Sequence, residues 1–364
     1  MKKIFMIGQF PGQLNGLTIA NQTLENGLKE NYQVEKIDLS LSSEFENKKD
    51  QGKFKVKKFF TIMSKILEQI IKLIKTESNV VYLTPGQSFL GFMRLSPYML
   101  VCMLRKIPYY NHIHGGHFRK MYNSQSKFKQ KILDFFIKKS SGIIVLGNSL
   151  KSMFEGIATE DKIYICENGV QDNLIATVDE IRDKIERHKN DNKKRVLYLS
   201  NLMEEKGVLD LLRASEKFND DEIEFSLAGA IEPNIKEKVE YYLEKYPEKI
   251  KYHGIVRGIE KKKLFLENYI FILPTYYSNE GQPISILEAY ANGCAVLTDE
   301  TVGGIRDVFE NTINGISIKS RDVESIFNGI RDISENRYFK ENYEKAIKKY
   351  TKKIFIKNID KIIL

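Results

Sequence analysis

Cysteine is scarce in this sequence: only Cys102, Cys166 and Cys294 occur among 364 residues. Their number is odd, they lie far apart, and there is no Cys-x-x-Cys pair, so they indicate neither a disulfide framework nor a zinc site. Motifs for haem and flavin are also lacking. A reduced, cytoplasmic environment is therefore the simplest expectation.

Long hydrophobic runs are lacking as well. The chain begins with two lysines and a few apolar residues, a run too short for the core of a signal peptide, which predicts a buried first strand. The best candidate for a membrane span, residues 89–108, is interrupted by Arg94, Pro97 and Arg105. It falls short of the ~20 continuous apolar residues that a spanning helix needs. We expect a soluble or peripheral protein.

Acidic residues are too few to balance the basic ones in the first half of the chain. Residues 1–175 hold 25 Lys and Arg against 15 Asp and Glu, a net charge of +10, whereas the remainder holds 32 and 33, a net charge of −1. No helix-turn-helix, zinc-finger or RNA-recognition signature accompanies this charge, so we do not expect nucleic acid as a partner.

The densest basic stretch, residues 48–75, combines nine lysines with apolar residues at helical spacing. Two interpretations stay open. Such a helix can lie on an anionic membrane surface, where each basic residue contributes on the order of 1 kcal/mol, or it packs in the core and its polar face is simply rich in lysine. A second basic cluster favours a surface role, and it comprises Arg119, Lys120, Lys127, Lys129, Lys131, Lys138 and Lys139.

Strand-like apolar runs alternate with helical patterns along the chain, which predicts an α/β fold with parallel, doubly wound sheets. The expected strands are residues 4–7, 80–84, 109–112, 142–146 and 162–166, then 195–200, 224–228, 250–253, 270–273 and 295–298. A polar segment, residues 183–194, predicts a linker between a first domain of residues 1–182 and a second of residues 195–339. Ligands of such sheets bind at the carboxyl ends of the strands.

One segment after a predicted strand carries two glutamates, Glu280 and Glu288, eight positions apart. Pro283 fits the first position of a helix, where its missing N–H costs nothing. The backbone amides from Gly281 to Ser285, with the helix dipole, form a site for an anionic group. At ~1.5 Å rise per residue, Glu288 reaches a different part of an elongated ligand. A phosphate between two hydroxyl-bearing rings fits this layout, and two solvated carboxylates are the alternative.

This segment resembles the Glu-x7-Glu signature of retaining glycosyltransferases with the GT-B architecture, family 4, or glycosyl transferases group 1. The resemblance extends over most of the chain, through residues 8–18, 112–116, 167–170 and 200–207. It implies two Rossmann-like domains facing across a cleft, with a C-terminal helix, about residues 340–364, that crosses back to the first domain. The first domain would lie on the acceptor side, and the second would bind the nucleotide sugar.

The resemblance also implies roles for single residues in the second domain. Lys206 would bind the diphosphate, and its place between a strand end and Gly207 suits that role. Family members usually carry an Arg five residues earlier, where this chain has Asn201, which can donate a hydrogen bond to a phosphate but adds no charge. Glu280 would bind hydroxyls of the donor sugar and Glu288 those of the ribose, since a carboxylate can accept from a vicinal diol. The remaining residues predicted to bind the donor are Gly281, Gln282, Pro283, Ile284 and Ser285.

In the first domain, the same resemblance implies that His114 is the histidine near the reacting sugar. Three of the five histidines, at positions 112, 114 and 117, lie around one Gly-Gly pair, and His117 is a weaker candidate for acceptor binding. Gly16, with Gly12, belongs to the first loop, where glycine lets the backbone approach a ligand; an ordinary turn is the alternative. Gly303 and Gly304 would close the donor pocket opposite the predicted lysine.

The chain has no Asp-x-Asp, the motif with which the other main glycosyltransferase architecture binds a metal-bound diphosphate. We therefore predict metal-independent transfer of a hexosyl group, with a nucleotide sugar as co-substrate and no further cofactor. By resemblance the base is uridine, or else guanosine, and the acceptor is a glycan or lipid-linked saccharide in cell-surface polysaccharide synthesis. The expected location is cytoplasmic, with peripheral contact at the inner face of the membrane left open.

Three other functions stay open from the sequence. A nucleotide-sugar epimerase of the same architecture would use the carboxylates for proton abstraction or elimination. A degenerate member would bind a nucleotide sugar without catalysis, an idea that Asn201 keeps open. A secreted two-domain sugar-binding protein is the third, and the lack of a signal sequence counts against it.

Overall fold

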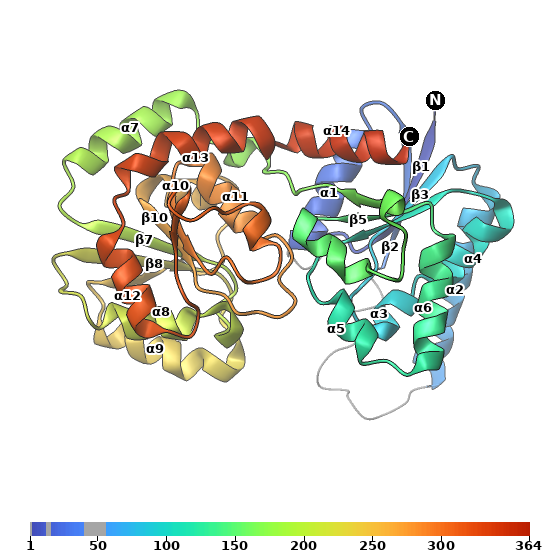
Figure 1. The fold of residues 1–364 in the computed structure, drawn as a ribbon, viewed down its shortest axis with the longest axis horizontal. Helices are drawn as coiled ribbons and strands as arrows, with labels where there is room; N and C mark the ends of the chain where they lie inside the picture. Colours follow the sequence, from blue (N-terminus) through green and yellow to red (C-terminus); the bar gives the residue numbers. More distant parts are fainter. Residues whose placement is uncertain (1, 12–15, 40–55) are drawn as a thin grey trace. The chain divides into compact units, whose positions relative to one another are not determined.

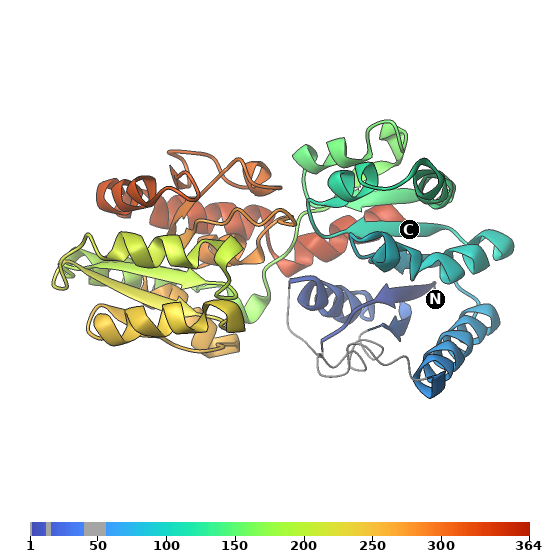
Figure 2. The same cartoon turned by 90° about the horizontal axis from the view of Figure 1, so that it is seen from below.

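The computed structural model describes residues 2–11, 16–39 and 56–364. The chain divides into two compact units (Figure 1). Unit 1 comprises the residues up to Glu167 together with Phe355–Leu364, and unit 2 comprises Asn168–Ile354. Each unit contains a parallel sheet with helices on both faces, as a second view also shows (Figure 2).

Within the described residues of unit 1, the sheet has six strands in the order β2-β1-β3-β4-β5-β6, and all neighbours pair in parallel. The strands are β1 (Lys3–Gly8), β2 (Gln33–Asp38), β3 (Val80–Leu83), β4 (Tyr109–Ile113), β5 (Gly142–Val145) and β6 (Ile163–Ile165). The sequence predicted all of these except β2, an edge strand whose side chains are mostly polar and only partly buried.

Helices on the two faces of this sheet build two apolar clusters. On one face, α1 (Gly16–Leu28) and α14 (Lys352–Ile363) bury Leu24, Phe355 and Ile359. The other face carries α2 (Val56–Lys75), α3 (Phe89–Met93), α4 (Ser96–Arg105), α5 (Phe118–Asn123) and α6 (Lys127–Lys139). The C-terminal helix thus returns to unit 1, but only from Phe355 onward.

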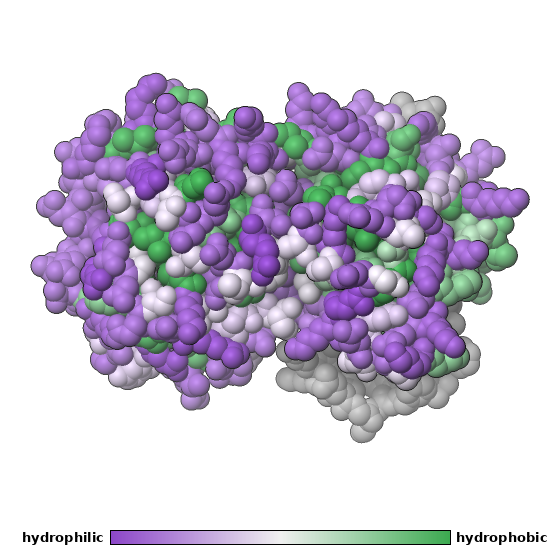
Figure 3. Space-filling view, viewed as in Figure 1, coloured by the Kyte–Doolittle hydropathy of each residue, from purple (hydrophilic) through white to green (hydrophobic). Residues whose placement is uncertain are grey.

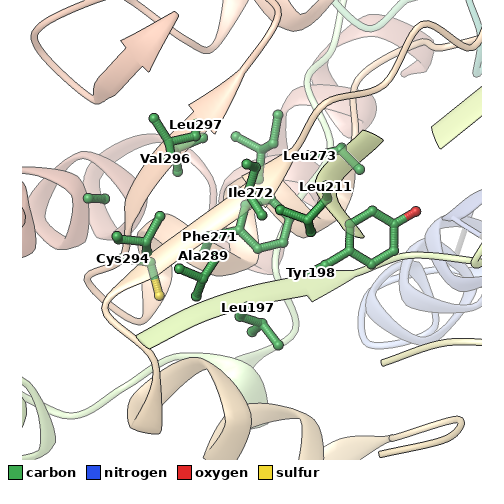
Figure 4. Packing of buried hydrophobic residues seen from close by; sticks show 14 of the residues in the cluster. Leu197, Tyr198, Leu211, Phe271, Ile272, Leu273, Ala289, Cys294, Val296 and Leu297 are labelled. Carbon is green, nitrogen blue, oxygen red and sulfur yellow. The ribbon is translucent and has the colours of Figure 1, made fainter. Parts of the chain in front are cut away.

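The sheet of unit 2 also has six parallel strands, in the order β12-β11-β10-β7-β8-β9. They are β7 (Lys194–Leu199), β8 (Ile223–Ala228), β9 (Ile250–Tyr252), β10 (Ile270–Leu273), β11 (Ala295–Thr298) and β12 (Gly315–Ser317). The sequence missed β12, a three-residue edge strand. Figure 4 shows side chains of β7, β10 and β11 packed with Leu211 and Ala289, all of them buried.

Two groups of helices cover this second sheet. One group is α8 (Val208–Ser215), α9 (Lys236–Lys245) and α12 (Val323–Asp332), in which α8 contacts both of the others. The other is α7 (Val178–Lys189), α10 (Gly258–Glu267), α11 (Ile284–Ala291) and α13 (Asn336–Lys349). Because α13 packs on α11 and α7, the first part of the predicted C-terminal helix of about residues 340–364 belongs to unit 2.

The predicted linker, residues 183–194, is not the boundary between the units. It forms the end of α7 and the start of β7, and the units divide at Glu167 and Asn168. The segment is polar because most of α7 is exposed, yet its Lys184 is fully buried, and the ammonium donates to the carbonyls of Phe265 and Asn292 at 2.9 and 2.8 Å. Backbone acceptors satisfy this lysine, so a polar sequence here still belongs to the folded unit.

The two segments considered for membrane contact are both helical. Residues 89–108 fold into two short helices, α3 and α4, that are separated at Arg94. No helix in the described ranges is long and apolar enough to cross a membrane. Of the predicted basic helix, residues 48–55 lie outside the described residues, and α2 buries Leu73 while it leaves Leu67 and Ile71 exposed.

Candidate functional site

The strand order of unit 2 reverses beside β7. The chain passes from β7 to β8 and β9 on one side and then returns to β10, β11 and β12 on the other. In open parallel sheets, ligands bind outside the carboxyl ends of the strands where the order reverses. The loops at this point follow β7 and β10, and they contain Lys206 and Glu280.

The loop that carries Lys206 is held against the end of β10. It forms a short 3₁₀ turn, Glu204–Lys206, and then Gly207 adopts a φ of 77° before α8 begins. A Cβ at Gly207 would lie 2.1 Å from the carbonyl oxygen of Pro274, so only glycine permits this contact. The amide of Tyr276 also donates to the carbonyl of Glu205 at 2.9 Å. These contacts place Lys206 beside the loop after β10.

Lys206 and Glu280 form an ion pair in which the ammonium donates to Oε2 of the carboxylate. The hydroxyl of Thr275 donates to the same oxygen at 3.2 Å. The Lys206 ammonium lies 5.0 Å from the centre of the Tyr277 ring. The side chains of Lys206 and Glu280 are only 14% and 9% exposed, so the pair is largely shielded from water.

The helix α11 begins beside this pair. Pro283 is its N-cap, so the helix starts at Ile284, one residue later than predicted. The first-turn amides of a helix have no acceptor within the helix, and those of Ile284 and Ser285 are among them. A Cβ at Gly303, whose φ is 54°, would lie 2.1 Å from the carbonyl oxygen of Glu280. The Gly-Gly turn after β11 therefore packs on the backbone of the loop before α11.

Glu288 lies in the second turn of α11 and is 2% exposed. Its two carboxylate oxygens lie 2.7 and 2.5 Å from the ammonium of Lys261 on α10. The alternative of two solvated glutamates is therefore wrong, because both are buried and each is paired with a lysine. Lys261 was not predicted, since it is one of three consecutive lysines, and only the packing of α10 on unit 2 selects it.

Two other predicted residues of unit 2 have different surroundings. The backbone amide of Asn168, from the predicted 167–170 motif, donates to Oε1 of Gln282 at 2.7 Å, and both side chains are buried.

Asn201 is exposed, and its backbone carbonyl accepts from the Tyr198 hydroxyl at 3.0 Å. Burial raises the pKa of Tyr198 well above its usual range, and the nearby Glu280 charge raises it further. Tyr198 and Thr275 were not predicted, because each reads as an ordinary strand-end residue.

In unit 1, His114 directly follows β4. Its ring centre lies 4.0 Å from that of His112, whose Nδ1 lies 2.5 Å from the hydroxyl of Tyr82. Burial lowers the pKa of His114 to about 3 and that of His112 well below its usual range. Both rings are therefore uncharged near neutral pH. The amide of His117 donates to Oε1 of Gln87 at 2.7 Å.

The first loop is described only in part. Gly16 is exposed and begins α1, whereas the predicted Gly12 lies outside the described residues. Within the described ranges, no three His, Cys, Asp or Glu side chains are grouped so that they could hold a metal ion. The three cysteines are buried and form no disulfide.

Solved structures with this architecture identify the class of the fold as GT-B, with two Rossmann-like domains in one chain. Sucrose-phosphate synthase from Thermosynechococcus elongatus superposes with a TM-score of 0.72 at 14% identity, over 100% of this chain and 98% of its own. Anabaena HepE, solved in complex with UDP-glucose, gives a TM-score of 0.74 at 14% identity, over 99% of both chains.

A family model matches the second half of the chain. Residues 179–354 match the profile of the family described as Glycosyl transferases group 1, so this segment is similar to that family. An uncharacterized glycosyltransferase of Methanocaldococcus jannaschii is 25% identical over 248 residues, which cover 65% of this chain. The alignment spans 62% of the length of that relative. The predicted resemblance to glycosyl transferases group 1 is confirmed for this segment, whereas family 4 and the retaining mechanism stay predictions.

Proposed function

We propose that this chain is a retaining, metal-independent glycosyltransferase of family 4 that transfers a hexosyl group from a UDP-sugar. The acceptor would be a glycan or lipid-linked saccharide in cell-surface polysaccharide synthesis, reached from the cytoplasmic side of the membrane. The observation that carries the proposal is the buried pair of Lys206 and Glu280 beside the start of α11, where the strand order reverses.

The pair suits transfer from a nucleotide diphosphate. Negative charge grows on the leaving diphosphate as the glycosidic bond breaks, while the sugar becomes oxocarbenium-like. Lys206 and the first-turn amides of α11 would bind the diphosphate oxygens. In the structure Glu280 pairs with Lys206. A bound diphosphate would compete for the ammonium and leave the Glu280 carboxylate to accept from hydroxyls of the donor sugar.

The second glutamate suits the other end of the donor. Glu288 is buried and held by Lys261, so its oxygens are already oriented when a ligand arrives. A carboxylate in a fixed orientation can accept two hydrogen bonds from the ribose diol. UDP as the nucleotide is supported by the UDP-glucose in the structure of Anabaena HepE, a protein whose fold this chain shares.

In unit 1 we propose His114 as the residue near the reacting sugar. Its pKa of about 3 keeps the ring neutral. The neutral imidazole of His114, or the backbone carbonyl of the same residue, can lie beside the positive charge that develops on the sugar. A protonated imidazolium would repel that charge. The exposed Asn201 would donate to a phosphate without adding charge, so Lys206 would be the main cation for the leaving group.

A panel of nucleotide sugars tests the proposal by thermal shift and by donor hydrolysis in the presence of EDTA. One donor should stabilise the wild type and release its nucleotide, and both effects should be lost in Lys206→Ala and Glu288→Ala. Lys348→Ala, which changes an exposed lysine on α13, is the matched control. If no donor shifts the melting temperature at millimolar concentration, the proposal fails. Release of an isomerised nucleotide sugar would instead indicate an epimerase.

A further inference from the structure

Two phenylalanines on α6 point into solvent. Phe128 is 73% exposed and Phe135 is 47% exposed. They are seven residues apart, which puts them on one face of the helix, with the partly buried Ile132 between them. The opposite face of α6 buries Leu133 and Ile137 in the apolar cluster of this sheet face. The two phenylalanines are therefore not needed to hold α6 in place.

The neighbouring helix α4 also exposes apolar side chains. α4 packs beside α6 and exposes Leu100 and Leu104, one turn apart, at 44% and 83%. Figure 3 shows apolar surface, in green, over α4 at the right-hand edge of unit 1. Single exposed apolar residues are ordinary, but a group on adjacent elements indicates an interaction site. We call this surface, Leu100, Leu104, Phe128 and Phe135, the α4–α6 face.

Lysines accompany the α4–α6 face without carboxylate partners. α6 contains five lysines and one acidic residue, Asp134, whose carboxylate accepts from the Tyr122 hydroxyl. Within the described part of the chain, none of the α6 lysines lies within ion-pair distance of a carboxylate. All five are exposed: Lys127, Lys129, Lys131, Lys138 and Lys139. In unit 2, by contrast, exposed lysines such as Lys245 and Lys251 do pair, with Glu216 and Glu224.

We propose that the α4–α6 face docks on an anionic phospholipid membrane. Exposed Phe and Leu side chains enter the boundary between headgroups and acyl chains, while the unpaired lysines lie at the level of the anionic headgroups. The net charge of +10 on residues 1–175 acts in the same direction. The inference rests on the proposed function, because it gives a lipid-linked acceptor a place to meet the enzyme.

Co-sedimentation of the full-length protein with vesicles tests the docking, without donor or acceptor. Vesicles of phosphatidylcholine mixed with phosphatidylglycerol should bind the wild type, those of phosphatidylcholine alone should bind it much less, and added salt should weaken binding. The double variant Phe128→Ser, Phe135→Ser should bind roughly tenfold or more weakly, as expected when apolar contacts are lost. Each Lys→Gln change at positions 131, 138 and 139 should weaken binding by about fivefold.

Matched controls lie on unit 2. Val178→Ser changes a residue that is 63% exposed, and Lys348→Gln with Lys349→Gln removes two exposed charges from α13. Both control variants should bind like the wild type. Melting temperatures of all variants should stay within a few degrees of the wild type, so that weaker binding cannot be ascribed to unfolding.

Three outcomes would overturn the docking: no binding of the wild type to anionic vesicles, equal losses in the control variants, or wild-type dimers that the Phe128→Ser, Phe135→Ser variant abolishes. Dimers of that kind would make the face a self-association surface. Donor hydrolysis separates this inference from the proposed function. Intact hydrolysis without vesicle binding refutes only the docking, and vesicle binding without hydrolysis by any donor refutes only the transferase.

Discussion

Lys261 on α10 holds both carboxylate oxygens of Glu288 on α11, at 2.7 and 2.5 Å, in a site where Glu288 is 2% exposed. The ammonium neutralises a carboxylate that would otherwise be buried without a counter-ion. It also fixes the orientation of that carboxylate before any ligand is bound. Lys261 is therefore a positioning residue for the glutamate that we propose binds the ribose.

The ion pair of Lys261 and Glu288 should contribute to the stability of the fold. Lys261→Met leaves a buried charge unpaired and should lower the free energy of unfolding by about 3 kcal/mol, because breaking a buried pair on one side costs more than removing both partners. The double variant Lys261→Met, Glu288→Leu should recover most of the loss. Urea denaturation of the wild type, both single variants and the double variant measures the coupling. Additive losses would mean that the two side chains do not interact.

A second prediction concerns the rate of transfer. Lys206→Ala should lower kcat by on the order of a hundredfold or more, the size expected when one group that stabilises the leaving charge is removed. Lys206→Arg should keep a larger part of the activity, since it retains the cation. Steady-state kinetics with the donor found by thermal shift measure both. Wild-type kcat in Lys206→Ala would exclude this lysine from the stabilisation of the leaving group.

Gly207 offers a test of the backbone contact that places Lys206. Gly207→Ala combines a φ of 77° with a Cβ 2.1 Å from the Pro274 carbonyl oxygen, and it should lower the free energy of unfolding by about 3 kcal/mol and weaken donor binding. Gly156 is the matched control, because its φ is 72° and a Cβ there meets nothing within 4 Å. Gly156→Ala should cost only about 1 kcal/mol. Equal losses in the two variants would show that the close contact is unimportant.

The buried histidine of unit 1 predicts a dependence of stability on pH. The pKa of His114 is about 3 in the folded protein, and that of an unfolded histidine is about 6.5. Between these values the unfolded chain binds the proton and the folded chain does not, so stability falls as the pH drops below about 6.5. The slope for one such group approaches about 1.4 kcal/mol per pH unit.

Urea denaturation of the wild type and His114→Asn at several pH values between about 7 and 4 measures this slope. The substitution removes one titrating group, so the variant should lose less stability per pH unit than the wild type. His253→Asn is a control, because His253 lies in unit 2 and its pKa is lowered less far by partial burial. The same slope in wild type and His114→Asn would show that His114 titrates normally in the folded protein.

The sequence predicted the architecture well because the central strands are strongly patterned. The strands β1, β3 and β10 are almost wholly buried and read as nearly continuous apolar runs, as strands covered on both faces do. The two strands that were missed, β2 and β12, are edges of their sheets. An edge strand has one neighbour and more contact with solvent, so its apolar pattern is weak.

The linker predicted at residues 183–194 is an error of the opposite kind, because the sequence predicted a feature that the structure does not have there. Residues 183–194 are polar, and polarity usually marks a connection between domains. Here Lys184 is buried because carbonyls from two distant segments surround its ammonium. The local sequence gives no sign of hydrogen-bond acceptors that lie 81 and 108 positions away. The predicted boundary between the two domains was therefore too late in the chain.

By itself the sequence determined which residue types stand at the ends of the strands: Lys206 before a glycine, Glu280 before Gly281, and Glu288 within the following helix. These follow from local rules, because glycine, proline and helix starts act over a few residues. Only the tertiary structure decided which charges meet. Lys206 pairs with a carboxylate 74 positions away and Lys261 with one 27 positions away. Parallel strands bring the loops at their carboxyl ends, and the first turns of the helices that follow, to one edge of the sheet whatever their separation along the chain.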